Sequence, residues 1–206
     1  MGANKEVFSP RKAPRQERAR VTVECILIAA KTIILKNGYE AATTNHIADV
    51  AGVSIGSLYQ YFPSKEAIVV ALVEEVVLKT GECTRKFLID RMNLPLSSAI
   101  PQIVQHLMEV RKEFGRVLRY LAREVPKFGK VSGQLTTEKY LYSTIHAFYT
   151  QHRDEIKVAD LEVAMFVVEH LVVGAIDAYL DNNAPALDEE QLVEQIAEAV
   201  LKYLTK

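Results

Sequence analysis

Apolar residues recur at steps of three and four along almost the whole chain, which is the period of an amphipathic helix. The pattern is clear at Ile26, Ala29 and Ile33, and it returns at Ile68 and Leu72. No segment shows the alternating period of a strand, and nine glycines and seven prolines in 206 residues leave room for long helices. The sequence therefore predicts an all-α fold of about nine helices.

Turn and capping residues indicate where these helices begin and end. Gly38 follows the first long helix and suits the left-handed position after its last turn. Ser97 or Ser98 is expected to cap a helix that begins at Ala99. Asp188 is expected to cap the last helix of the chain.

The composition excludes several classes of protein. Apolar residues make up 49% and charged residues 25%, which is typical of a globular protein and not of a disordered one. The only cysteines, Cys25 and Cys83, match neither a disulfide framework nor a metal site. No run of about 18 uncharged apolar residues indicates a membrane span, and the basic N-terminus lacks the apolar core of a signal peptide. We therefore expect a cytoplasmic protein with no membrane span, metal or cofactor.

Positive charge is concentrated toward the N-terminus. Residues 1–65 carry nine Lys and Arg against five Asp and Glu, whereas residues 66–206 carry sixteen against twenty-one. This asymmetry indicates either an anionic partner at one end, such as nucleic acid, or a basic segment without a partner. Residues 1–14 read as a basic disordered arm, which either contacts DNA or only keeps the protein in solution.

Residues 43–66 have the pattern of a helix-turn-helix, with two short helices separated by a glycine turn. At about 100° per residue, Ser54, Leu58 and Tyr61 fall on the inward face of the second helix. The outward face suits the major groove of DNA, where recognition helices contact base edges. The alternative is a tight helical corner in which the tyrosines pack and Lys65 is solvated. The outward residues are Ile55, Gly56, Tyr59 and Gln60.

This stretch strongly resembles the TetR (tetracycline-repressor-like) family of bacterial transcription regulators. The resemblance extends from about Arg18 to Val73 and fades after about Val77. It implies a three-helix DNA-binding head, here residues 15–63, and a six-helix effector-binding and dimerisation body, here residues 64–206. The resemblance is carried by Thr44, Ile47-Ala48, Ala51-Gly52-Val53-Ser54, Gly56, Leu58-Tyr59, Tyr61-Phe62 and Lys65-Glu66.

Members of that family usually act as homodimers on palindromic operators in double-stranded DNA, and an effector releases them. The resemblance places Ile55 at a position that varies widely and tunes specificity. It assigns the remaining DNA surface to Thr44, Ser54, Gly56, Ser57, Tyr59, Gln60, Tyr61 and Lys65.

Residues 161–180 are apolar on nearly every side, so they need cover on several sides. Met165, Val168, Val172 and Ile176 suit a core of the chain itself. The alternatives for the rest of the helix are a larger monomeric core or a second copy of the chain. The resemblance favours the second copy, with an interface formed by Val167, Gly174, Ala178, Leu192, Ile196 and Val200.

Aromatic and polar residues of the middle helices suit a pocket for a small hydrophobic or aromatic effector, with a polar or anionic end. The alternative is that they are ordinary core aromatics and surface histidines. The candidates are Phe87, His106, Phe114, Arg119, Phe148, Tyr149 and His170.

These patterns predict a ligand-responsive transcriptional repressor. An enzyme is disfavoured because the chain shows no nucleophile elbow, phosphate loop or zinc signature. The remaining alternative is a helical adaptor that binds a protein partner. The motifs do not identify the operator, the effector or the regulated genes, and an activator would need the same DNA-binding head.

Overall fold

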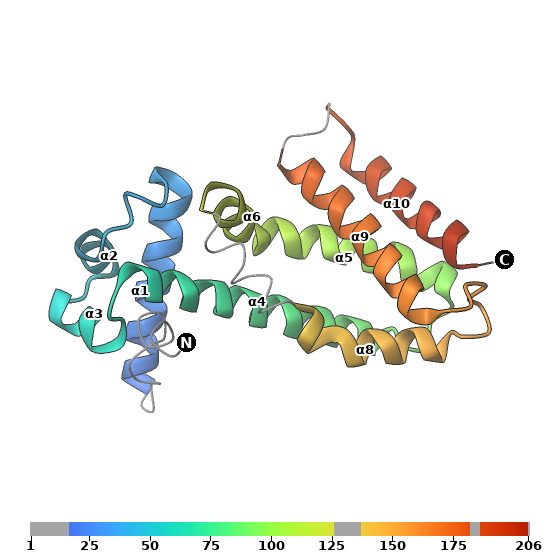
Figure 1. Cartoon of the computed structure of the whole chain (residues 1–206), viewed down its shortest axis with the longest axis horizontal. Coiled ribbons are helices and arrows are strands. Elements are labelled where there is room, and N and C mark those ends of the chain that lie inside the picture. Colours follow the sequence, from blue (N-terminus) through green and yellow to red (C-terminus); the bar gives the residue numbers. More distant parts are fainter. Residues whose placement is uncertain (1–16, 126–136, 182–185, 206) are drawn as a thin grey trace, which may run out of the picture. The chain divides into compact units, whose positions relative to one another are not determined.

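The computed structural model describes residues 17–125, 137–181 and 186–205, and the predicted arm at residues 1–14 lies outside these ranges. The described residues form nine helices, which confirms the all-α prediction (Figure 1). The helices are α1 (Glu17–Asn37), α2 (Thr44–Ala51), α3 (Ile55–Tyr61), α4 (Lys65–Asp90), α5 (Leu96–Glu113), α6 (Gly115–Glu124), α8 (Thr137–Gln151), α9 (Leu161–Leu180) and α10 (Glu189–Leu204).

The helices form two compact units. The first contains residues 17–77 and 120–125, and the second contains residues 78–119, 137–181 and 186–205. The first unit therefore extends beyond residue 63, where the sequence suggested a domain boundary. The reason is that the N-terminal half of α4 belongs to the first unit and is apolar, with Ile68 fully buried.

The first unit is held together by a small apolar core. Ile26 and Ile34 of α1, Ile47 of α2 and Leu58 of α3 are fully buried, and α2 contacts both α1 and α3. The chain leaves α1 through Gly38, whose φ of 87° is left-handed as predicted. These contacts fix the positions of the two short helices.

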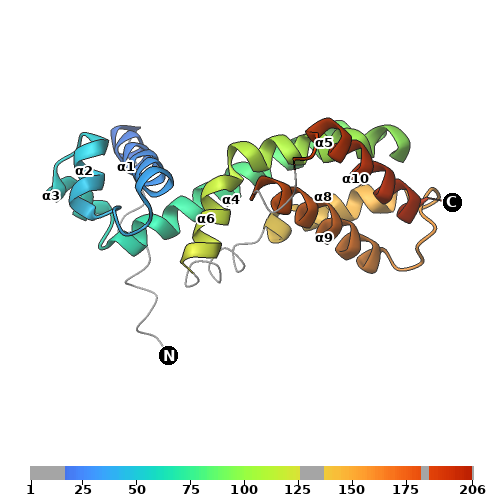
Figure 2. The same ribbon diagram turned by 90° about the horizontal axis from the view of Figure 1, so that it is seen from above.

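In the second unit, α9 packs against α5, α8 and α10, and α10 also packs against α5 (Figures 1 and 2). Its core includes Met108, Ala164 and Ile176, all fully buried. Two arginines join α5 and α6 to α9: Arg111 binds the carboxylate of Asp177, and Arg119 lies 3.0 Å from Asp181. The apolar core and these ion pairs together hold α9 in place.

Helix α5 begins earlier than the sequence predicted. It starts at Leu96, and neither predicted serine caps it, because the N-cap residue is Pro95. The N–H group of Leu96 instead donates to a carboxylate oxygen of Glu155, at 3.1 Å. This capping group lies 59 positions away in sequence, so no local pattern could have revealed it.

Candidate DNA-binding surface, effector cavity and dimer surface

Side chains that cap the two short helices shape the turn between them. The hydroxyl of Thr43 accepts from the N–H of His46 at 3.2 Å, at the start of α2. At the start of α3, the hydroxyl of Ser54 accepts from the N–H of Ser57 at 3.1 Å. Between the helices, Gly52 has a left-handed φ of 68°, a conformation that favours glycine. Local residues therefore determine how α3 leaves α2.

The structure exposes all four residues of the predicted outward face of α3. Ile55, Gly56, Tyr59 and Gln60 are exposed, as is the capping residue Ser54, which the sequence placed inward. The inward prediction holds for Leu58, which is fully buried. The other three candidates of this region, Thr44, Ser57 and Tyr61, are half-buried.

Hydroxyl groups on this surface are held in pairs. Thr44 of α2 and Tyr59 of α3 lie 3.1 Å apart, oxygen to oxygen, and thus join the two helices. The hydroxyls of Ser54 and Ser57 lie 2.8 Å apart. Such pairs orient hydroxyl groups in advance, and an oriented hydroxyl can bind a phosphate oxygen.

Lys65, the remaining candidate, bonds within its own unit. Its ammonium group donates to the carbonyl of Tyr39 at 2.9 Å and lies 3.4 Å from the carboxylate of Glu40. It also lies 3.7 Å from the centre of the Tyr39 ring, and the side chain is 17% exposed. This amine therefore fastens the chain after α1 to the start of α4, and the contact of Lys65 with DNA stays a prediction.

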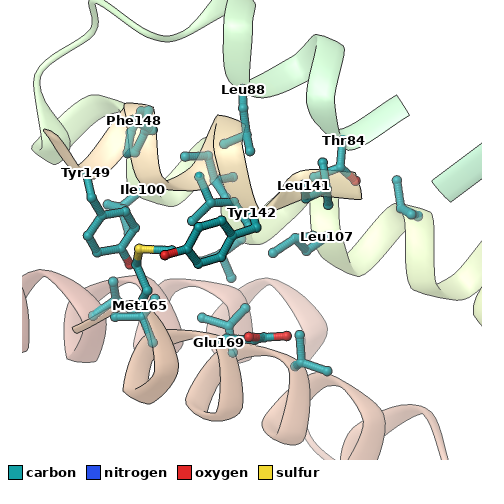
Figure 3. Close-up of a pocket in the computed structure, with 18 of the residues that line it drawn as sticks. Thr84, Leu88, Ile100, Leu107, Leu141, Tyr142, Phe148, Tyr149, Met165 and Glu169 are labelled. Carbon is teal, nitrogen blue, oxygen red and sulfur yellow. The ribbon is translucent and has the colours of Figure 1, made fainter. Parts of the chain in front are cut away.

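The second unit contains a cavity of about 220 Å³ between five helices (Figure 3). Figure 3 shows Thr84 and Leu88 entering from α4, Tyr149 from α8, and Met165 and Glu169 from α9. The lining is predominantly aliphatic and aromatic. It consists of Thr80, Thr84, Leu88, Ile100, Ile103, Val104, Leu107, Val110, Arg111, Leu141, Tyr142, Ile145, Phe148, Tyr149, Met165, Val168, Glu169, Val172, Val173 and Val200.

Of the predicted effector residues, Phe148 and Tyr149 line this cavity. Burial raises the pKa of the Tyr149 phenol, so this side chain stays neutral at physiological pH. The wall residues that sequence reasoning missed are mainly aliphatic side chains of α5 and α9, which resemble any other core residues in the sequence. Only their spacing on helices indicated that they would be buried.

The other predicted effector residues lie outside the cavity lining. Phe87 stacks on His106 with ring centres 3.9 Å apart, and burial lowers the pKa of this imidazole. Phe114 is the C-cap residue that follows α5, and Arg119 is bound to Asp181. His170 is exposed. These five predictions were wrong for this cavity, because aromatic and basic residue types do not reveal which face of a helix they occupy.

Helix α9 presents a second apolar face that its own unit leaves uncovered. Val163 and Phe166 are exposed, the latter by 62%, and Gly174 and Ala178 lie further along the helix and are also exposed. By length and composition, α9 is the one helix of the described residues that could cross a membrane, and 22% of its most apolar stretch is buried inside the protein. The sequence criterion for a membrane span requires about 18 uncharged apolar residues in a row, and α9 does not meet it. A criterion based on mean hydropathy tolerates a few charges, and α9 meets that one.

Two predicted interface residues instead belong to the core of the protomer. Ile196 is 5% exposed and Val200 is 1% exposed, and Val200 also lines the cavity. They were misassigned because α10 packs this face against α5 and α9. Val167 and Leu192 are half-buried.

Within residues 17–125, 137–181 and 186–205, no group of three or more His, Cys, Asp or Glu is placed to hold a metal ion.

Two family models match the chain. "Bacterial regulatory proteins, tetR family" matches residues 26–72, which contain α2 and α3. "Tetracyclin repressor-like, C-terminal domain" matches residues 95–204, which contain α5, α8, α9 and α10. The matches thus include both the helix-turn-helix and most of the cavity wall.

Similar proteins extend the match over most of the chain. The HTH-type transcriptional regulator YhgD of Bacillus subtilis is 25% identical over 189 residues, which cover 87% of this chain and 95% of YhgD. A solved TetR-family structure from Mesorhizobium loti has a TM-score of 0.76 at 17% identity, covering 93% of this chain and all of that one. The regulator FadR of B. subtilis, solved with stearoyl-CoA, has a TM-score of 0.68 at 20% identity. This match covers 87% of this chain and 98% of FadR.

The two solved structures show the fold of this chain, and the family models show to which family it belongs. The C-terminal model alone covers more than half of the 206 residues, and the N-terminal model covers the helix-turn-helix. The chain is therefore a helix-turn-helix transcriptional regulator and not an enzyme, and it belongs to the TetR family of bacterial regulatory proteins.

Proposed function

We propose that this protein is a cytoplasmic repressor that binds a palindromic operator as a dimer and is released by a small hydrophobic or aromatic effector. The observation that carries the proposal is the apolar cavity in the second unit of a chain whose first unit is a helix-turn-helix. A regulator needs a surface that reads DNA and a separate site that senses a ligand.

The exposed face of α3 is the proposed reading surface. Ile55 suits contact with a thymine methyl group, and Gln60 suits the paired donor and acceptor of adenine. A Cβ atom on Gly56 would come no closer than 3.9 Å to Ser54, so the protein itself does not require glycine there. A missing side chain at this exposed position instead allows DNA to approach the backbone.

Hydroxyl groups around this face are the proposed phosphate contacts. Thr44 and Tyr59 present hydroxyls joined to each other across α2 and α3, and Ser54, Ser57 and Tyr61 supply more. Contacts of this kind position a protein on the duplex without reading its sequence. Lys65 contributes indirectly, by holding Tyr39 and the start of α4 together.

The cavity is the proposed effector site. Its wall is largely apolar, and its volume of about 220 Å³ suits a small ligand or part of a longer one. FadR of B. subtilis, which has a similar fold, was solved with stearoyl-CoA, a ligand with a long apolar chain. That similarity supports an apolar effector here.

The uncovered face of α9 is the proposed dimer surface. Exposed apolar side chains such as Phe166 would be covered by the same helix of a second copy, and the small residues Gly174 and Ala178 would let the helices approach closely. A two-fold dimer matches a palindrome whose half-sites lie about 34–36 Å apart. An effector then releases DNA if it binds better to a conformation with a different head spacing.

Selection of bound fragments from random and genomic DNA, at about 150 mM salt, tests this proposal. We expect the purified protein to enrich a palindrome, and apolar compounds to reduce the affinity for it. A Gln60→Ala variant should relax base preference at one position of each half-site. Recovery of no sequence above random would overturn operator binding, and a stoichiometric protein partner would then favour the adaptor alternative.

A further inference from the structure

Two threonine hydroxyls line the cavity without a hydrogen bond to any described residue. Thr80 and Thr84 lie one turn apart on α4, and Leu88 continues the same stripe along the cavity wall. Their Oγ1 atoms are buried and have no hydrogen-bond partner among the described residues. The side chain of Thr84 is 4% exposed, and its oxygen is drawn in Figure 3.

Threonines elsewhere in the described helices can bond to the backbone of their own helix. The hydroxyl groups of Thr32 and Thr150 each donate to the backbone carbonyl four residues earlier, at 2.8 Å. Thr205, which follows α10, does the same with the carbonyl of Leu201. A buried hydroxyl without a partner is unfavourable, so two of them on one wall indicate a missing bonding group.

The charges around the cavity limit what that group can be. Arg111 is the one cation among the described lining residues, and its guanidinium is bound to the carboxylate of Asp177. Glu169 is the one carboxylate among the described lining residues, and its side chain is exposed. A buried carboxylate on the effector would therefore find no free cation among these described residues. The sequence suggested an effector with a polar or an anionic end, and of these two an uncharged polar oxygen that accepts hydrogen bonds fits better.

We propose that Thr80 and Thr84 are the polar recognition point of the effector cavity and donate hydrogen bonds to a carbonyl or hydroxyl oxygen of an uncharged, largely apolar effector. This inference rests on the proposed role of the cavity as the effector site. The aliphatic wall binds the body of the molecule, and the two hydroxyls select and orient its oxygen.

Three small probes of similar shape test the pair: acetophenone with a carbonyl, ethylbenzene without an oxygen, and benzoate with a negative charge. Their affinities are measured by NMR titration of the full-length protein. The T80V/T84V variant replaces both hydroxyls with methyl groups of similar size. We expect this variant to bind acetophenone about tenfold more weakly, with the affinity for ethylbenzene unchanged or higher.

Thr150→Val is the matched control, because the hydroxyl of Thr150 donates to the carbonyl of His146 and the residue is absent from the cavity lining. This control should alter neither affinity. An equal loss of acetophenone and ethylbenzene in T80V/T84V would show that the threonines only shape the wall, and would overturn the inference. Tighter binding of benzoate than of acetophenone to the wild-type protein would overturn the uncharged class.

Thermal unfolding of the free protein separates a ligand-binding role from a structural one. The T80V/T84V variant should unfold at the same or a higher temperature, because it removes unpaired buried hydroxyls. A lower temperature in T80V/T84V and in both single variants would indicate structural bonds and contradict the inference. If wild-type protein bound none of the probes, both this inference and the effector cavity would fail, whereas operator selection would still test the regulator.

Discussion

In the helix-turn-helix, the hydrogen bonds that shape the turn join residues three positions apart, as between Thr43 and His46. The cavity of the second unit is instead lined by side chains from α4, α5, α8, α9 and α10, from Thr80 to Val200. Neighbours in sequence can form a surface, but a cavity requires segments that meet only after folding. Four predictions test how far this difference extends.

The largest expected effect contrasts the two faces of α3. Leu58→Ala should lower the free energy of unfolding by about 2–5 kcal/mol, because it empties a fully buried site. Ile55→Ala, on the exposed face, should change it by less than about 0.5 kcal/mol while altering operator preference. Urea denaturation and DNA titration measure the two effects. Similar losses of stability in both variants would contradict the division into an inward and an outward face.

The next effect tests the long-range contacts of the second unit. Arg119→Met should destabilise the protein by about 1–3 kcal/mol, because it leaves Asp181 without its cation and Asp177 with Arg111 alone. Lys112→Met is the control, since its ion pair with Glu189 is more exposed than that of Arg119 and should contribute less than about 1 kcal/mol. Equal losses of stability for these two variants in urea denaturation would show that the burial of an ion pair does not determine its contribution.

A smaller effect compares glycines of the two units. Gly52→Ala should cost about 1–2 kcal/mol, because the backbone is left-handed although a Cβ atom would meet nothing within 4 Å. Gly174→Ala should instead stabilise the protomer by about 0.5–1 kcal/mol. Gly174 lies inside a helix, where glycine is unfavourable, and a Cβ atom there would meet nothing within 4 Å. If Gly174 lies in a dimer interface, sedimentation should also show weaker association. A stabilised Gly52→Ala variant would contradict the backbone argument.

The smallest effect is a pH dependence in the second unit. Burial lowers the pKa of His106 below its ordinary value of 6.5, so the unfolded chain binds the proton more tightly. The charge of Glu109 opposes this shift, and the charge of Arg91 reinforces it. Stability should therefore be full above about pH 6.5 and fall as the pH decreases toward the folded pKa. The His106→Phe variant should show a weaker dependence of stability on pH, measured by thermal unfolding at several pH values. An unchanged dependence would show that other groups cause it.

Much of the fold follows from local patterns. The bounds of α9 agree with the predicted segment 161–180, and the predicted cap at Asp188 is confirmed because its carboxylate accepts a hydrogen bond from the N–H group of Gln191. These succeed because helix period and capping depend on neighbours within about four residues. The start of α5 was missed because its first N–H group is bound by the distant Glu155.

The candidate sites were predictable to different degrees. The exposed positions of α3 follow from its helical period alone, since one face must pack against α2. The cavity lining did not follow from residue type, because Phe87 and Phe148 look alike in sequence but only Phe148 reaches the wall. Ile196 and Val200 were similarly ambiguous, because an apolar residue suits a core and an interface equally.

The sequence by itself determined the all-α class, the helix-turn-helix and the outward face of α3, because each depends on spacing within one or two turns of helix. The tertiary structure decided that the amine of Lys65 is held by Tyr39, and that the hydroxyls of Thr80 and Thr84 line a cavity without a partner among the described residues. These outcomes depend on which residues far apart in sequence come into contact, and the helical period of a segment carries no information about such contacts.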